Sequence, residues 1–391
     1  MSKKLFVVLG VMVVISMLLG ACGTSATPTA APAATTVPAT AAAAATAVPT
    51  MAASAAPKIL VGIVTDTGGI DDKSFNSSAW LGVQQSETDL GVDGKYLESH
   101  QQSDYAKNIQ EFLNEDAGLI VTVGYLMGVD TANAAKANPN TKFAIVDYSY
   151  PDCAAGQKEG TDCGSSTSLP NVVGIIYQTD QAAFLGGYLA AGMTKTGVVG
   201  EFGGLQIPTV TIYMKGFQAG VEYYNQKHNT NVKLLGWDDV AQKGTFVNNF
   251  TSTDDGNKTA QSLQQEGADI IMPVAGSVGL GSAAYCEQSK SCLIIGVDQD
   301  WYVSAPEYQD IELVSVLKEI NVSVEAVVKS VLGSTYQGGT ANNTLANGGV
   351  GLSPYHNFDS QVPASLKSEI DQAKADLISG AITVNGVLGE K

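Results

Sequence analysis

Residues 61–80 read VGIVTDTGGIDDKSFNSSAW, an apolar run followed by acidic residues, two adjacent glycines and aromatic residues. The apolar run predicts a buried strand over residues 59–65, and the segment 75–90 predicts a helix with Asp72 or Ser74 as its N-cap. The glycines let the chain turn tightly off the strand. A strand that leads directly into a helix is typical of proteins built on parallel sheets, so this stretch indicates an α/β fold.

The alternation of strand and helix continues along the chain, is interrupted by a polar loop at residues 150–170, and restarts after the strand expected at 172–177. Two such arrays in tandem predict two lobes, each a parallel sheet flanked by helices. We place lobe 1 at 58–178 with about 299–345 returning to it, and lobe 2 at 179–298 with about 346–391 partly returning. The other expected strands are 119–123, 143–146, 172–177, 197–202, 232–236, 269–273, 293–297 and 312–317, and the other expected helices are 104–114, 130–137, 180–193, 210–226, 256–267, 279–288, 319–332 and 364–378.

Composition and charge limit the classes of function. The chain has 391 residues, of which 45% are hydrophobic and 15% charged, so it is long enough for two packed domains with ordinary cores. Its formal net charge of −17 argues against nucleic acid as a partner, because no basic patch is available to release the counterions of phosphates.

The N-terminal segment indicates export. Lys3 and Lys4 precede an apolar run at 5–19 that is short for a membrane span, and Leu-Gly-Ala-Cys follows at 19–22. This arrangement resembles the signal peptide and lipobox of bacterial lipoproteins. It implies removal of residues 1–21, acylation of Cys22 and an extracytoplasmic protein anchored to the outer face of a membrane. The alternative is an uncleaved anchor with an incidental cysteine.

The segment after Cys22 has a restricted composition. Residues 24–56 contain only Ala, Thr, Pro, Ser, Val and Met, which cannot build a specific core, and the spaced prolines disfavour a continuous helix. We therefore interpret residues 22–57 as an extended tether between the lipid anchor and a globular body.

Four cysteines remain in the body of the chain, which favours disulfide bonds in an exported protein. They allow three pairings, of which one closes two small loops, 153–163 and 286–292. Neither spacing is typical of a zinc site, and the chain has three histidines, so we expect structural disulfides, no metal and no cofactor. The four residues are Cys153, Cys163, Cys286 and Cys292.

Polar residues follow four of the apolar runs. Asp66, Asp147, Asp298 and Lys318 each stand where an expected strand ends. The carboxyl ends of parallel strands meet at one edge of a sheet, where ligands bind in open α/β proteins. A single Asp at such a position is more often a cap or turn residue, but four polar residues at the ends of four strands predict a shared cleft. Spacing alone favours Phe75 as a core residue over one that presents its ring to a planar ligand.

Signals of enzyme chemistry are few. The segment around Ser277 lacks the first glycine of a nucleophile elbow, and the sequence has no Walker loop and no calcium loop of the helix-loop-helix type. GLGSAA at 279–284 matches G-x-G-x-x-A, with Asp298 about twenty residues further on, so a nicotinamide-dependent dehydrogenase is an alternative from another class. An exported lipoprotein has little access to such cofactors, which weighs against it.

Further stretches follow the opening one in order: TVGYLMG, FAIVDY, NVVGIIYQTDQAAFLGGYLAAGMTKTGVVGEFGG, IPTVTIYMKGFQAGV, GADIIMPVAGSVGLG, IIGVDQD and VSVLKEINVSV. With the opening stretch they resemble the basic membrane protein family, the purine-nucleoside-receptor-type substrate-binding lipoproteins of ABC importers. The resemblance covers roughly residues 58–360, and the opening stretch is quite specific to the family.

The resemblance implies a two-lobed periplasmic-binding-protein fold of type I, with a three-stranded hinge and a ligand enclosed between the lobes. The implied ligand is a purine nucleoside such as guanosine, inosine or adenosine, delivered to an ABC permease with its ATPase subunits. We expect a monomer that is not an enzyme. Another small ligand, such as a sugar, riboflavin or a signalling molecule, is the alternative within this class.

The resemblance also implies which residues hold the base. Phe75 would stack on the purine. Asn76 and Asp147 would hydrogen-bond the edge of the base, with Asp66 nearby.

The implied sugar site lies on the second array. Asp298 would take ribose hydroxyls, Lys318 would reach the ribose or support Asp298, and Gly276 would approach the sugar with bare backbone. Tyr213 stands where the family usually has a second stacking phenylalanine. It also begins an apolar helix stripe, so a core role for it stays open. Trp301 is a candidate for the mouth of the cleft.

Overall fold

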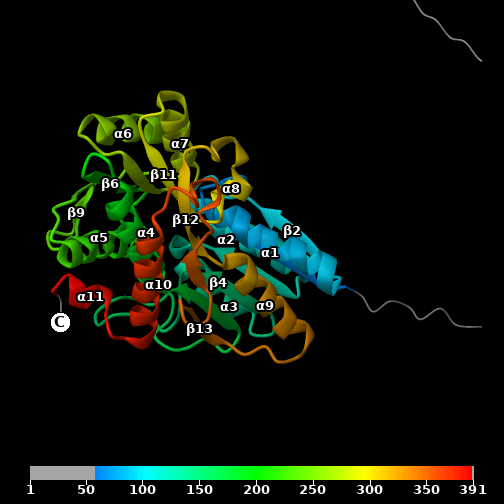
Figure 1. The fold of residues 1–391 in the computed structure, drawn as a ribbon. Coiled ribbons are helices and arrows are strands. Elements are labelled where there is room, and N and C mark those ends of the chain that lie inside the picture. Colours follow the sequence, from blue (N-terminus) through cyan, green and yellow to red (C-terminus); the bar gives the residue numbers. More distant parts are fainter. Residues whose placement is uncertain (1–57, 390–391) are drawn as a thin grey trace, which may run out of the picture. The chain divides into compact units, whose positions relative to one another are not determined.

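The computed structural model of the chain describes residues 58–389. The predicted signal peptide, Cys22 and the linker up to residue 57 lie outside the described residues. The described part contains two large sheets of six strands each, which form the cores of two lobes (Figure 1). Over residues 58–389, no helix combines the length and the apolar character needed to cross a membrane.

Lobe 1 is a sheet of six parallel strands with helices on both faces. Its elements are β1 (Leu60–Thr65), α1 (Phe75–Leu90), β2 (Asp93–Leu97), α2 (Tyr105–Asn114), β3 (Leu119–Val123), α3 (Gly128–Ala137), β4 (Lys142–Val146), β5 (Val172–Tyr177), α9 (Ile320–Leu332) and β13 (Gly339–Asn343). The strand order is β13-β5-β4-β3-β1-β2. Side chains alternate along β1, so Ile63 joins the core cluster that contains α1 and α9 residues, and Val64 joins the cluster that contains α2 and α3 residues.

Lobe 2 repeats this plan with the order β14-β12-β11-β10-β6-β7, and only β14 runs antiparallel to its neighbour. Gly216 and Gly220 let α5 lie on the backbone of α4, because a Cβ at either position would come within 2.3 Å of a carbonyl oxygen of α4. The elements are α4 (Thr179–Met193), β6 (Val198–Gly203), α5 (Pro208–His228), β7 (Lys233–Leu235), a hairpin of β8 (Trp237–Asp238) and β9 (Lys243–Gly244), α6 (Thr253–Gln265), β10 (Ile270–Val274), α7 (Ser277–Ser289), β11 (Leu293–Asp298), α8 (Trp301–Ser304), β12 (Glu312–Lys318), β14 (Val350–Leu352), α10 (Ala364–Ser379) and α11 (Val384–Val387).

Three short segments carry the chain between the two sheets, after β5, after β12 and after β13. They are hydrogen-bonded to one another. The amide of Gln178 donates to the carbonyl oxygen of Asn343 (2.8 Å), and the amide of Glu319 donates to the carbonyl oxygen of Gly349 (3.0 Å). This arrangement agrees with the expected three-stranded hinge.

The predicted return of residues 299–345 to lobe 1 is wrong in its first part. Residues 312–318 form β12, which pairs with β11 inside the second sheet, so the return begins only with α9. The physical reason is the burial of nearly every residue of β12, which requires sheet neighbours and cover on both faces.

Trp301 does not lie at the mouth of a cleft. Its side chain is fully buried, and its indole nitrogen donates to the carbonyl oxygen of Val297 (3.1 Å). Gly279 and Gly296 make room for the ring, since a Cβ at either position would come within 2.8 Å of it. Trp301 is therefore a core residue of lobe 2.

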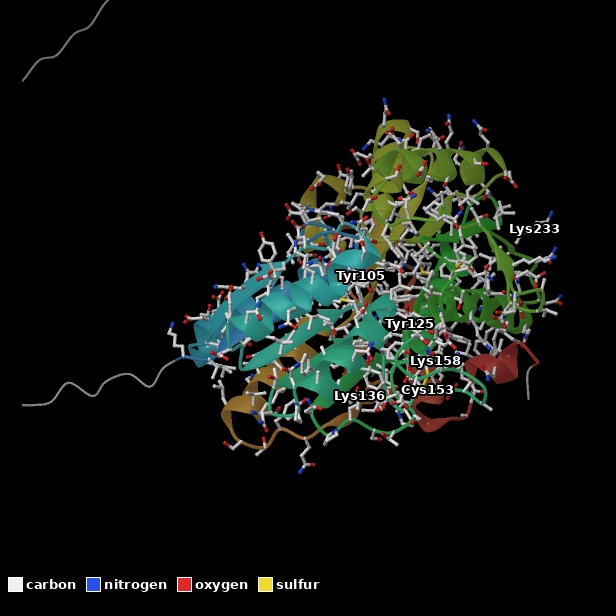
Figure 2. The ribbon with its side chains drawn as sticks, turned by 180° about the vertical axis from the view of Figure 1, so that it is seen from behind. Tyr105, Tyr125, Lys136, Cys153, Lys158 and Lys233 are labelled. Atoms are coloured by element: carbon white, nitrogen blue, oxygen red, sulfur yellow. A yellow bond between two sulfur atoms is a disulfide. The ribbon has the colours of Figure 1, made fainter. Side chains whose placement is uncertain are left out.

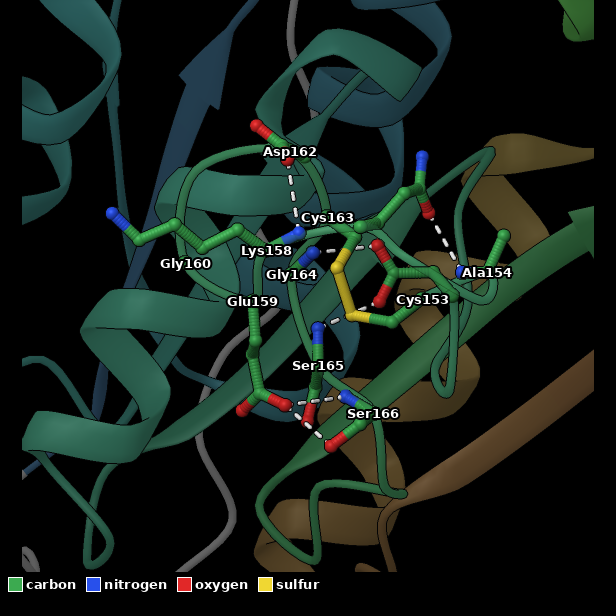
Figure 3. Close-up of a disulfide and its surroundings, with 12 residues drawn as sticks. Cys153, Ala154, Lys158, Glu159, Gly160, Asp162, Cys163, Gly164, Ser165 and Ser166 are labelled. Carbon is green, nitrogen blue, oxygen red and sulfur yellow. Dashed lines mark hydrogen bonds between the residues drawn. A yellow bond between two sulfur atoms is a disulfide. The ribbon is translucent and has the colours of Figure 1, made fainter.

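The four cysteines form two short-range disulfides. Cys153 and Cys163 close the loop between β4 and β5 with Cα atoms 5.1 Å apart (Figure 3). Cys286 and Cys292 join the last turn of α7 to the segment before β11, with Cα atoms 5.0 Å apart.

Candidate functional site

One cavity between the lobes is lined by all eight residues that the sequence assigned to ligand binding. Its walls border about 540 Å³ of space free of protein atoms, part of which is open to solvent. Most of its charged groups stand at the carboxyl ends of strands in both sheets, as expected for an open α/β protein. The eight residues are Asp66, Phe75, Asn76, Asp147, Tyr213, Gly276, Asp298 and Lys318.

Asp72 fixes the start of α1 and so places the first lobe 1 residues. Its carboxylate accepts from the amides of Ser74 (3.0 Å), Asn76 (2.8 Å) and Ser77 (3.0 Å). These contacts satisfy the free amides at the start of the helix. Ser74 holds the N-cap position but its side chain makes no capping hydrogen bond. Burial raises the pKa of Asp72 to about 7.

Asp66 and Asn76 face each other across the loop between β1 and α1. The Asn76 side-chain amide donates to Asp66 Oδ1 (2.7 Å), and the amide of Gly68 donates to the same oxygen (2.9 Å). Burial raises the pKa of Asp66, against these hydrogen bonds. Asn76 Oδ1 is buried and has no hydrogen-bond partner among the described residues. The accepting capacity of this oxygen is therefore unused among the described residues.

Asp147 and Lys318 form a buried ion pair between the lobes. Lys318 Nζ lies 2.5 Å from Asp147 Oδ2, and both side chains are less than a tenth exposed. The ammonium also lies near three aromatic rings, with centres 4.8 Å (Phe75), 5.1 Å (Tyr177) and 5.8 Å (Tyr213) away. Burial raises the pKa of Asp147, although the Lys318 charge acts in the opposite direction.

Asp298 is held by two hydroxyl groups, one from each lobe. Tyr213 Oη donates to Asp298 Oδ1 (2.7 Å), and Ser74 Oγ donates to Asp298 Oδ2 (2.5 Å). Gln299 adds a second bridge, because its side-chain amide donates to the carbonyl oxygen of Ser74 (2.9 Å). Tyr213 is thus both buried in the core of lobe 2 and part of the cavity wall, and its hydroxyl has the partner that burial requires.

Backbone and aromatic groups complete the cavity. Gly276 precedes α7 with a φ of 54°, which favours glycine, and its backbone faces the cavity. Phe75 is partly buried and lines the cavity, so the core role favoured by its spacing is not its whole role. Sequence reasoning missed Tyr125 and Phe250, which also line it. Tyr125 follows Gly124 at the exit of β3 and could have been found by the strand-exit argument; Phe250 lies in a loop and carries no such signal.

The segment GLGSAA does not form a dinucleotide loop. Gly279 and Gly281 lie inside α7, after its first residue Ser277, and not in the turn that precedes the helix. Gly281 packs on α6, since a Cβ there would come 1.9 Å from the carbonyl oxygen of Thr253. Asp298 is already bound by the two hydroxyls described above. The dehydrogenase alternative therefore loses the motif on which it depended.

Among residues 58–389, no group of three His, Cys, Asp or Glu side chains could hold a metal ion. Two hinged α/β lobes with a polar and aromatic cavity between them are the architecture of the type I periplasmic-binding fold. A solute-binding protein of an ABC transporter from Aeropyrum pernix has the same fold, with a TM-score of 0.72 and 24% identity over 83% of this chain and 92% of that one. One from Conexibacter woesei gives a TM-score of 0.62 and 20% identity, covering 83% of this chain and 98% of that one.

The family follows from the sequence comparisons. The profile of the PnrA-like substrate-binding proteins of ABC transporters, called Bmp, matches residues 59–386, so the chain belongs to this family. The ABC transporter nucleoside-binding protein BmpA of Lactococcus lactis is 31% identical over 340 residues, 82% of this chain and 88% of that protein. The CD4+ T-cell-stimulating antigen of Listeria monocytogenes is 29% identical over 342 residues, 83% and 87% respectively. The family consists of solute-binding proteins, which are not enzymes.

Proposed function

We propose that this chain binds a purine nucleoside between its lobes and delivers it to the permease of an ABC importer. The observation that carries the proposal is the combination, in one cavity, of the rings of Phe75 and Tyr213 with four aspartate side chains. A nucleoside offers a flat apolar base for such rings and neutral N–H and O–H donors for carboxylates. The name of the Lactococcus lactis relative, a nucleoside-binding protein, supports the same ligand class.

The base is assigned to lobe 1. Phe75 stacks on the purine, and Asp147 accepts from N–H groups at the edge of the base. Asn76 Oδ1, which is buried without a partner among the described residues, accepts another. A ligand donor at this position would remove the penalty of a buried unsatisfied acceptor. Asp66 orients the Asn76 amide through the 2.7 Å hydrogen bond.

The ribose is assigned to lobe 2. Asp298 accepts from the sugar hydroxyls, and Gly276 brings bare backbone against the ring. Lys318 pairs with one of the cavity carboxylates, Asp147, and reaches toward the sugar from the end of β12. Tyr213 supports Asp298 through its hydroxyl and offers its ring to the base.

A ligand that contacts both lobes stabilises the closed arrangement. The lobes already share direct contacts at the cavity, among them Lys318 to Asp147 and Ser74 to Asp298. Nucleoside contacts to residues of both lobes add to these and bias the hinge toward closure. The closed form is the one presented to the permease.

The decisive experiment is a calorimetric titration with guanosine and guanosine monophosphate. We expect saturable binding of guanosine at one site, and binding of the monophosphate weaker by roughly two orders of magnitude, because its phosphate faces uncompensated carboxylates. Phe75→Ala should weaken guanosine binding strongly. Equal affinities for the two ligands would contradict this assignment. If only a sugar or a flavin raised the melting temperature, the ligand would belong to that class and not to the nucleosides.

The anchoring of the protein is part of the proposal. Cys22 after Leu-Gly-Ala would carry the lipid that holds the chain on the outer face of the membrane, with residues 22–57 as tether. A lipoprotein of Pyrococcus furiosus that is 30% identical over 77% of this chain supports this reading. Cys22→Ala should release the protein from the membrane fraction, and retention of the variant would speak against lipidation at this residue.

A further inference from the structure

We propose that the disulfide-closed loop of lobe 1, residues 150–166, positions Tyr125 as a wall of the ligand cavity, so that ligand affinity depends on the Cys153–Cys163 disulfide. The loop itself does not line the cavity; it acts through Tyr148 and Asp152. The choice of nucleoside as probe rests on the proposed function.

Tyr125 is the point of contact with the cavity. It begins the 3-10 turn Tyr125–Met127 directly after Gly124, whose φ is 132°. Gly124 lies against Asp66, since a Cβ at this glycine would come 3.2 Å from that of the aspartate. Tyr125 therefore stands beside the carboxylates of lobe 1, on the side of the cavity assigned to the base. An aromatic wall at this place adds contact area to a planar ligand.

Tyr148 supports the ring of Tyr125 from behind. The two ring centres are 5.1 Å apart, and Tyr148 in turn packs on Tyr150 at 5.3 Å. A Cβ at Gly128 would come 2.4 Å from the ring of Tyr148, so this ring lies directly on the backbone at the start of α3. The Tyr148 hydroxyl donates to the carboxylate of Asp152. Tyr148 is thus held by packing and by one hydrogen bond into the loop.

Asp152 connects Tyr148 to the disulfide. Its carboxylate accepts from the amides of Gly164 (2.6 Å) and Ser165 (2.7 Å), and its own amide donates to the carbonyl oxygen of Ser165 (3.0 Å). Cys153 follows Asp152 and Cys163 precedes Gly164. The disulfide therefore joins the two ends of the loop beside these hydrogen bonds (Figure 3). The covalent bond keeps the amides and the carboxylate in register.

The loop is also fixed to α3, the helix that follows Tyr125. Lys136 Nζ donates to the carbonyl oxygen of Gly164 (2.6 Å) and pairs with Glu159. Tyr125, Lys136 and Cys153 are labelled in one region of the molecule in Figure 2. Loss of the disulfide releases Gly164 from both anchors, Asp152 and Lys136, and so loosens Tyr148 and the wall formed by Tyr125.

The second disulfide provides a matched control. Cys286 and Cys292 are 6 residues apart, against 10 for the first pair, so both close short loops of similar entropic effect. This disulfide lies at the C-terminal end of α7, whereas the cavity is lined by Gly276 at the N-terminal end. We expect removal of this disulfide to lower the stability of the protein and to leave the residues that line the cavity in place.

The test compares guanosine affinity by calorimetry and melting temperature for the intact chain and three variants. Cys153→Ser/Cys163→Ser should raise the Kd roughly tenfold, the value of a lost aromatic contact. Cys286→Ser/Cys292→Ser should leave the Kd within about twofold, although both double variants melt at lower temperature. Tyr148→Phe keeps the ring and both disulfides; it should raise the Kd by roughly threefold and lower the melting temperature less than either double variant does.

Amide hydrogen exchange across residues 124–137 supplies a readout that needs no ligand. Exchange should accelerate in the Cys153→Ser/Cys163→Ser variant and not in the control pair. If the intact chain binds no nucleoside, the proposed function falls, and this exchange pattern alone decides the inference. Equal affinity losses in the two double variants, or equal exchange in this segment, overturn the positioning role.

Discussion

The two lobes follow one plan but hold the carboxylates of the cavity in different ways. β4 and β11 take the same place in their sheets, and Asp147 and Asp298 stand at their ends, each with a φ of 68°. Asp147 meets the ammonium of Lys318, whereas Asp298 meets the hydroxyls of Tyr213 and Ser74. At equivalent backbone positions, the aspartate of lobe 1 is thus bound by a charged side chain, and the aspartate of lobe 2 is bound by neutral hydroxyl groups.

A second pair of equivalent positions differs in the core. β1 and β6 pair with β3 and β10 in the same register, which sets Ile63 opposite Val121 and Glu201 opposite Met272. Ile63 is an ordinary core residue. Glu201 is fully buried, and neither of its carboxyl oxygens has a hydrogen-bond partner among the described residues. Lobe 2 therefore carries a destabilising group where lobe 1 does not.

The largest expected effect is a difference in stability between variants of the two aspartates, Asp147 and Asp298. Asp147→Asn leaves the buried ammonium of Lys318 without a counterion and should lower the free energy of unfolding by about 3 kcal/mol. Asp298→Asn removes a charge that has only neutral partners and turns one of the two accepting oxygens into an NH2 donor, to which one hydroxyl can adapt by accepting, so it should cost about 1 kcal/mol. Asparagine tolerates the positive φ at both sites, so backbone strain does not obscure the difference.

Urea denaturation without ligand measures both variants. Lys318→Met in the Asp147→Asn background should recover much of the lost stability, because it removes the unpaired ammonium. If Asp147→Asn and Asp298→Asn lower the free energy of unfolding by the same amount, the difference between a charged and a neutral partner does not affect stability.

The next effect concerns Glu201. Burial raises the pKa of this carboxyl well above its usual value, and the nearby Asp239 adds to the shift. The folded state then binds the proton more tightly than the unfolded state, so stability falls as the pH rises above the usual Glu value of about 4.3 toward the raised one. Glu201→Ile, the residue of the equivalent position in lobe 1, should raise the free energy of unfolding by about 2 kcal/mol at pH 8.

The gain should shrink toward pH 5, where less of the unfolded-state carboxyl is ionised. Glu201→Gln keeps the shape and removes the titration of this one group, so its unfolding free energy should lose the part of the pH dependence that Glu201 contributes, without the full gain. Urea denaturation at the two pH values is the measurement. A gain from Glu201→Ile that is equal at pH 5 and pH 8 would show that the carboxyl is not the cause.

The sequence predicted the elements whose pattern is strong. The helix expected at 75–90 is α1 with the same bounds, and the four strand exits gave Asp66, Asp147, Asp298 and Lys318. They could be found because parallel strands bring their carboxyl ends to one edge, whatever the details of packing.

The missed features depend on tertiary contacts. β2 and β13 are short, half-exposed strands without an apolar run, and only pairing at the sheet edges makes them strands. Phe250 reaches the cavity from a loop, and Ser74 bonds Asp298 across 224 residues of sequence. No local sequence pattern predicts either contact.

A smaller effect tests packing at equivalent glycines. Gly62 of β1 and Gly200 of β6 occupy the same strand position, but a Cβ at Gly62 would come 2.5 Å from the ring of Phe112, and one at Gly200 would meet its neighbours at 3.3 Å. Gly62→Ala should lower the free energy of unfolding by about 2 kcal/mol through overpacking. Gly200→Ala should stay within about 1 kcal/mol of the parent chain, since reduced unfolded-state entropy offsets mild crowding. Thermal unfolding distinguishes the two, and equal melting temperatures would contradict the difference in packing.

The smallest effect isolates the hydroxyl of Tyr213. Tyr213→Phe keeps the ring in the cavity wall and removes one of the two donors to Asp298, so the free energy of unfolding should fall by about 1 kcal/mol. Ser74 continues to hold the other oxygen, and the oxygen set free can accept from a sugar hydroxyl, so guanosine affinity should change by less than about threefold. Urea denaturation and calorimetry measure the two quantities. A stability loss as large as that of Asp147→Asn would mean that a buried carboxylate needs its hydroxyl partners as much as its charged one, and the two lobes would then differ in chemistry but not in energy.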